Sequence, residues 1–144
     1  MSDPRSDAHE FIRMIPQARA LGIVVQSIAD GVAEISMPWD ARLVGDPKSG
    51  VIHGGAVFTL LDTASGMAVM SHPEASGPTA TLNLRVDYMR AATPGQGIRT
   101  RAECYMMTRS VAFVRATAFD DDDSRPVAIT TGAFTLDRKT GEQP

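Results

Sequence analysis

The chain has 144 residues, of which 43% are hydrophobic and 22% charged, and its formal net charge is −3. This length suits a single domain with one core, and the composition is that of a globular protein. The acidic balance argues against nucleic-acid binding. A single cysteine, Cys104, excludes an internal disulfide, and three scattered histidines form no zinc motif. We therefore expect a reducing cytoplasm, no metal and no cofactor.

Targeting and membrane segments are not evident in the sequence. The N-terminus lacks the apolar region that a signal peptide needs, and no run approaches the roughly 20 apolar residues of a membrane span. We expect a cytoplasmic protein that makes no contact with a membrane.

The first part of the chain predicts a helical lead over residues 1–22 and then a β-hairpin. Apolar residues recur at helical spacing from Phe11, Pro16 interrupts them, and Gly22 is a plausible stop. Two stretches rich in β-branched residues flank the turn signal Asp30-Gly31, which predicts two paired strands. Residues 40–49 have the composition of a loop.

The stretch from Gly50 to Met70 predicts a buried central helix. Almost every position from Ala56 onward is apolar or small, and Asp62 carries the only formal charge of the stretch. A helix that is apolar nearly all round has to be enclosed on most sides.

Strand patterns follow the central helix, and the clearest is the alternation of polar and apolar residues over 79–89. Short turns join the later strands, which implies antiparallel neighbours. The chain is therefore predicted as a single α+β domain, 1–144, in which a curved antiparallel sheet of five to six strands wraps a long central helix. The later strands are expected over 98–108, 111–119 and 127–136, with an acidic turn over 120–126.

The start of the central helix and its one acid are the candidate functional groups. Asp62 in an apolar helix costs free energy unless it is hydrogen-bonded, exposed at an interface or used in chemistry. His53 could act directly or could orient the loop at the helix start. Gly54 and Gly55 either pack closely or present backbone amides to an anion.

The spacing of these groups limits how they can cooperate. Gly54 and Asp62 are eight residues apart, which on a continuous helix corresponds to about 12 Å along the axis. A general base and an oxyanion donor must both lie within about 3 Å of the same substrate atoms. Unless the helix breaks, the two groups must come from two copies of the chain, most simply with antiparallel central helices. The spacing thus predicts a homodimer with two shared sites.

Several motifs together resemble the PaaI-like acyl-CoA thioesterases of the hotdog-fold superfamily. Residues 50–55 read Gly-Val-Ile-His-Gly-Gly, and Asp62 follows His53 by nine positions. Residues 83–90 read Asn-Leu-Arg-Val-Asp-Tyr-Met-Arg, and Thr-Pro-Gly follows at 93–95. The resemblance covers roughly residues 20 to 137, and its most specific part is the His-Gly-Gly motif with the spaced acid.

The resemblance implies a hotdog fold, dimers joined into a continuous sheet, often tetramers, and an acyl-CoA substrate carrying a fatty or aryl acyl group. The family's oxyanion role falls on the amide of Gly54, and the acid role falls on Asp62 of the other chain, as base or nucleophile. The hydroxyl that helps to place the water falls on Thr81. We expect Arg90 and Arg109 to contact CoA phosphates.

One position departs from the family pattern. Many members have asparagine six residues before the motif histidine, where this chain has Pro47. Asp46 or Ser49 could substitute for it. The departure keeps open an alternative function, a hotdog module that binds acyl-CoA without hydrolysing it. A hotdog hydratase is a third reading, but its histidine–acid motif is absent from the sequence.

Overall fold

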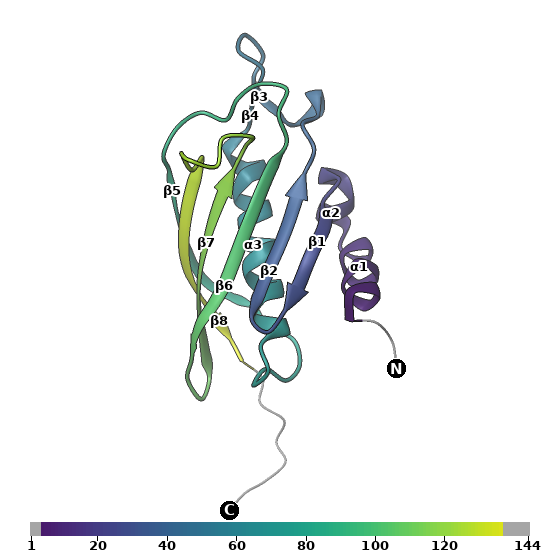
Figure 1. The fold of residues 1–144 in the computed structure, drawn as a ribbon, viewed down its shortest axis with the longest axis vertical. Helices are drawn as coiled ribbons and strands as arrows, with labels where there is room; N and C mark the ends of the chain where they lie inside the picture. The colour runs from purple at the N-terminus through teal and green to yellow at the C-terminus, as the bar shows by residue number, and fades with distance from the viewer. Residues whose placement is uncertain (1–3, 137–144) are drawn as a thin grey trace, which may run out of the picture.

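The computed structural model of the protein describes residues 4–136, with side chains from residue 8 onward, so both ends of the predicted domain lie outside it. Six antiparallel strands curve around one long helix, α3 (Gly54–Ser71), which confirms the predicted hotdog architecture (Figure 1). None of the described helices is long and apolar enough to cross a membrane. The strands of this sheet, in spatial order, are β1 (Val24–Ala29), β2 (Val32–Met37), β6 (Ile98–Met107), β7 (Val111–Phe119), β8 (Ala128–Thr135) and β5 (Thr81–Tyr88).

The predicted helical lead consists of two helices, α1 (Pro4–Met14) and α2 (Pro16–Leu21), and α1 begins before the apolar pattern does. The break falls at Pro16, which occupies the first turn of α2, where a missing amide hydrogen costs nothing. Gly22 ends α2 in a left-handed conformation with φ 68°, as a glycine cap does. Both helices lie beside β1 at one end of the sheet (Figure 1).

The hairpin of β1 and β2 turns at the predicted Asp30-Gly31 pair. Both residues have positive φ, 50° and 84°. Positive φ at both central residues is the hallmark of the type I′ turn, whose twist matches that of the paired strands. The turn chemistry therefore fixes the register, in which Ala29 lies opposite Val32.

The prediction of a plain loop before the central helix is wrong in detail. The segment contains a short 3₁₀ helix, Ala41–Leu43, and a small antiparallel pair of strands, β3 (Val44–Asp46) and β4 (Val51–Ile52). Strands of two or three residues are too short to produce a periodic pattern in the sequence. The pair holds the chain immediately before the start of α3.

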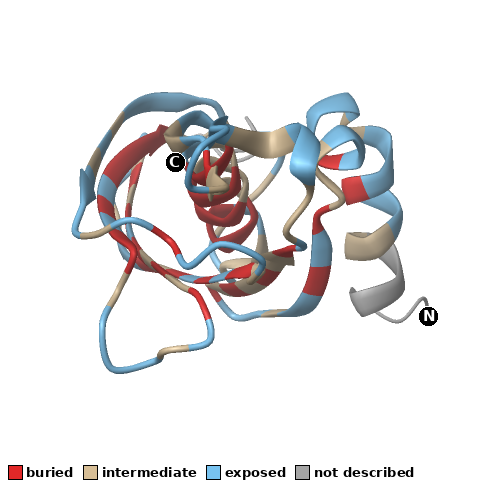
Figure 2. Cartoon of the chain, turned by 90° about the horizontal axis from the view of Figure 1, so that it is seen from above, coloured by how far each residue is buried: buried red, intermediate tan, exposed pale blue. Residues whose placement is uncertain are grey.

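The core lies between α3 and the concave face of the sheet, as the view from above shows (Figure 2). Leu60, Leu61 and Ala64 on α3 are fully buried. The facing positions of β6 and β7 alternate inward and include many small residues, so the sheet can approach the helix closely. These inward small residues are Ala102, Cys104, Ala112, Ala116 and Ala118.

β5 is an edge strand that is covered poorly by the rest of the chain. Among the described strands it pairs only with β8, and a register shift separates Thr81 from Asn83. Leu84 and Val86 pack against the core, whereas Leu82 and Tyr88 remain 55% and 51% exposed. An uncovered edge with apolar side chains is a natural template for pairing with another chain.

Candidate active site

Asp62 lies half-buried in the middle of α3, and its carboxylate is held by the first residue of β5. The Thr81 hydroxyl donates to Asp62 Oδ1 over 2.8 Å. The hydrogen bond occupies one oxygen and fixes the carboxylate. We found no hydrogen bond to the second oxygen among the described residues. The predicted pair of Asp62 and Thr81 is therefore brought together within one chain.

The start of α3 uses two of its backbone amides internally. His53 is the N-cap residue, and its Nδ1 accepts a hydrogen bond of 2.8 Å from the amide of Gly55. The amide of Ala56 donates to the carbonyl of His53 over 3.0 Å. Within the described chain, the amide of Gly54 is left without a partner. Gly54 can thus still donate to an anion at the positive end of the helix, whereas Gly55 is occupied by His53.

Tyr88 and Trp39 support this helix start, and the sequence reading gave neither a role. The Tyr88 hydroxyl donates to the carbonyl of Gly54 over 2.8 Å, and burial raises the pKa of this phenol, so it stays protonated. The ring of Tyr88 also lies against Gly54, where an added Cβ would come within 3.4 Å of it. Trp39 Nε1 donates to the carbonyl of Gly50. An aromatic residue at the end of the alternating strand is the one sequence signal that could have drawn attention to Tyr88.

The Gly54 amide and the Asp62 carboxylate, the two predicted functional groups of α3, do not meet in one chain. The helix runs unbroken from Gly54 to Ser71, so the distance between the two groups can be taken from the helical rise. The Gly54 amide and the Asp62 carboxylate are about 12 Å apart along the axis. One small reacting group cannot contact both.

Ser49 lies on the exposed turn between β3 and β4, beside the position of Pro47. Its hydroxyl donates to Asp46 Oδ2 over 2.7 Å, and this hydrogen bond lowers the pKa of Asp46. The two candidate substitutes for the family asparagine are thus bonded to each other. That Ser49 binds substrate, and that Asp46 or Ser49 replaces the asparagine, both stay predictions.

Arg90 is committed to structure in the described chain. Its side chain makes a bidentate ion pair with the buried Asp120, with both N–O distances 2.7 Å. The remaining guanidinium hydrogens donate to the carbonyls of Ala91 and Arg125. All the N–H groups of an arginine are used in this way, which leaves none for a phosphate.

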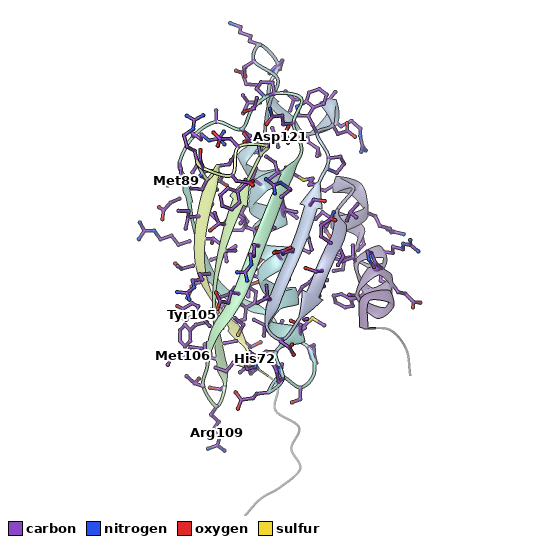
Figure 3. The ribbon with its side chains drawn as sticks, viewed as in Figure 1. His72, Met89, Tyr105, Met106, Arg109 and Asp121 are labelled. Carbon is purple, nitrogen blue, oxygen red and sulfur yellow. The ribbon has the colours of Figure 1, made fainter. Side chains whose placement is uncertain are left out.

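Arg109, the second predicted phosphate contact, lies at the tip of the β6–β7 hairpin. Figure 3 shows it at the opposite end of the molecule from Met89, the neighbour of Arg90 in sequence. The two arginines therefore cannot hold one phosphate group within a chain. Arg109 remains the exposed candidate of the pair.

A cavity of about 390 Å³ opens beside Gly54. Its walls are mainly apolar and include Val57 of α3 and the ring of Tyr88. Among the described residues, Arg90 is its one charged wall residue, and that charge is paired with Asp120. Within the described residues, no three His, Cys, Asp or Glu side chains form a group that could hold a metal.

Comparison with known proteins agrees with this fold. The thioesterase superfamily model matches residues 49–127, which include both Gly54 and Asp62. Escherichia coli PaaI, named as an acyl-coenzyme A thioesterase, is 30% identical over 97 residues, 67% of this chain and 66% of PaaI. The Salmonella typhimurium medium/long-chain acyl-CoA thioesterase YigI is 26% identical over 127 residues, 78% of this chain and 80% of YigI.

Solved structures extend the likeness to the whole fold. A Pseudomonas aeruginosa protein superposes with a TM-score of 0.82 at 34% identity, over 92% of this chain and 98% of that one. The structure of E. coli PaaI gives a TM-score of 0.81 over 92% of each chain, with 22% identity. The chain belongs to the thioesterase superfamily, a family of thioester hydrolases. Within that family its fold is that of a PaaI-like hotdog protein.

Proposed function

We propose that the protein hydrolyses acyl-CoA thioesters to a free acid and CoA at a site shared by two copies of the chain. The observation that supports this most directly is the pairing of a fixed carboxylate, Asp62, with an unpartnered helix-start amide, Gly54. The names of PaaI and YigI support the substrate class. A thiolate is a good leaving group, so one base and one oxyanion donor suffice.

In the proposed reaction Asp62 acts on water. The oxygen of a water attacks the thioester carbonyl carbon, and a water proton passes to the free oxygen of Asp62. The Gly54 amide of the second copy donates to the carbonyl oxygen as it becomes an oxyanion. The tetrahedral intermediate then collapses and its carbon–sulfur bond breaks. The departing CoA thiolate takes the proton from Asp62. Thr81 keeps the carboxylate oriented throughout.

The dimer follows from the separation of these groups on one unbroken helix. If two α3 helices run antiparallel with Gly54 facing Asp62 of the other copy, the residue midway between them, Phe58, lies on the twofold axis. Phe58 is 39% exposed, whereas Leu60 and Leu61 on the same helix are fully buried. The uncovered β5 edge, with exposed Leu82, offers a second element for pairing. Pairing of dimers into a tetramer stays a prediction.

Replacing Phe58 by cysteine is expected to give a disulfide-linked dimer under mild oxidation. Helices in contact lie about 8–10 Å apart between axes, with each Cα about 2.3 Å from its axis. Two Cα atoms that face each other across the twofold axis are then about 3.4–5.4 Å apart, which overlaps the disulfide range of about 4.4–6.8 Å. The native Cys104 does not interfere, because it is buried and burial raises the pKa of its thiol. Non-reducing electrophoresis measures the product.

Met70→Cys is the matched control, because Met70 is on the same helix and is also 39% exposed. In an antiparallel pair centred on Phe58, the two copies of position 70 are about 36 Å apart and cannot be linked. Crosslinking at position 70 instead of 58 would contradict the proposed arrangement of helices.

The function itself is tested with a panel of acyl- and aryl-CoA thioesters, by following the release of free CoA thiol. Hydrolysis of at least one class is expected. A chain whose melting temperature rises with acyl-CoA, but which releases no thiol from any member, would be the non-catalytic binding module instead.

A further inference from the structure

A second, larger cavity lies beside the C-terminal half of α3, where α1 and β1 approach it. It measures about 580 Å³. Its described walls are mainly apolar, and we call it the α1 groove. The side chains used below are Phe11 of α1, Met67 and Met70 of α3, and Asp30 of the β1–β2 turn.

The α1 groove meets the face of α3 that carries Asp62 at one residue, Met70. Gly66 and Met70 follow Asp62 at successive helical turns, and Met70 is also a wall of the groove. Gly66 has no side chain to close this path. Packing does not require a glycine at position 66, because a Cβ added there would meet only Phe134, at an ordinary 3.8 Å.

Large apolar side chains are exposed at the end of this path. Phe11 and Met70 are 38% and 39% exposed, although each lines the groove. Methionine is flexible and polarizable, so Met67 and Met70 can adapt to a hydrocarbon chain. The one described charge on the groove wall is Asp30, which disfavours a ligand with a negative end.

We infer that the α1 groove holds the methyl end of a long acyl chain whose thioester lies at Asp62, with Gly66 as the residue that sets the permitted chain length. This inference rests on the proposed function and specifies its substrate class. Asp62 and Met70 are about 12 Å apart along the helix. With C–C bonds of about 1.5 Å in zigzag, roughly ten carbons span that distance. Long chains therefore reach the groove, and short chains end before it.

The main test is Gly66→Leu, assayed with butyryl-CoA and palmitoyl-CoA. The new side chain is expected to block the path and to lower kcat/KM for palmitoyl-CoA at least about tenfold. Excluding only two methylenes of the acyl chain from the groove is sufficient for a change of that size. Butyryl-CoA hydrolysis should change less than about twofold, because its three C–C bonds span only about 4 Å and the chain ends before position 66, about 6 Å from Asp62 along the helix. Size-exclusion chromatography checks that the variant assembles as the wild type does.

A second variant, Met70→Gln, places a polar group of similar size at the groove without altering the path. It is expected to lower activity on palmitoyl-CoA selectively. Met106→Gln is its control, because Met106 is an exposed methionine near the β6–β7 turn, away from the groove (Figure 3).

The outcomes separate the two proposals. A wild-type protein that releases no thiol from any member of the acyl- and aryl-CoA panel overturns the proposed function. A wild type that hydrolyses other members of the panel but not palmitoyl-CoA overturns the groove assignment alone. A wild type that hydrolyses both butyryl-CoA and palmitoyl-CoA, with Gly66→Leu and Met70→Gln each affecting the two substrates equally or not at all, overturns the groove assignment alone.

Discussion

Asp62→Asn is expected to lower kcat for acyl-CoA hydrolysis by about 1,000-fold, the scale of a lost general base. The amide keeps the shape of the carboxylate, and its oxygen can still accept the hydrogen bond from Thr81. It cannot take a proton from water. Because binding contacts are retained, KM for the same substrate should change little. Thiol release measured over a range of substrate concentrations separates the two parameters.

Asp87→Asn is the matched control for this variant. Asp87 is an exposed carboxylate on β5, and its one described ion pair is with Arg85. Its removal should leave kcat near the wild-type value. If Asp62→Asn retained wild-type kcat while folded and dimeric, Asp62 could not be the base, and the proposed mechanism would fail.

The fold was largely predictable because its main signals are local. Pro16 and Gly22 act on their own backbone, and Asp30-Gly31 selects its turn by the φ values its residues adopt. The enclosure of α3 follows from the scarcity of polar positions in residues 50–70. Each of these signals operates within a few residues, so a sequence pattern can reveal it.

The site was predicted less completely because its contacts join distant parts of the chain. Asp62 and Gly54 could be found as exceptions to an apolar helix. The hydrogen bond from Tyr88 to Gly54 joins residues 34 positions apart, and no periodic pattern in the sequence predicts it. Arg90 was chosen for a phosphate, but its partner Asp120 comes 30 residues later, in what reads as an exposed acidic turn. A pattern in the sequence does not show which carboxylate of such a turn is buried.

Asp120→Asn is expected to destabilise the protein by about 3 kcal/mol, the scale for removing one partner of a buried ion pair. Asp120 is fully buried and accepts from Arg90, from the amide and hydroxyl of Thr93, and from the amide of Asp122. Its loss leaves Arg90, only 18% exposed, without a counter-charge. For a chain of this length, the melting temperature should fall by roughly 10 °C.

The lowered pKa of Asp120 should also make the stability of the fold depend on pH. The hydrogen bonds from Arg90 hold the pKa of Asp120 far below its usual range. A carboxylate whose pKa is lower in the folded state stabilises the fold at pH values above its unfolded pKa of about 3.9. That stabilisation is lost as the pH falls below this value, so the difference between wild type and Asp120→Asn should be full at neutral pH and shrink in acid. Asp123→Asn is the control, because Asp123 is exposed and paired with Arg99 at the surface, where an ion pair contributes at most about 1 kcal/mol. Denaturant unfolding of the three proteins at neutral and acidic pH measures the effect, and equal losses for both variants would mean that Asp120 contributes no more than a surface carboxylate.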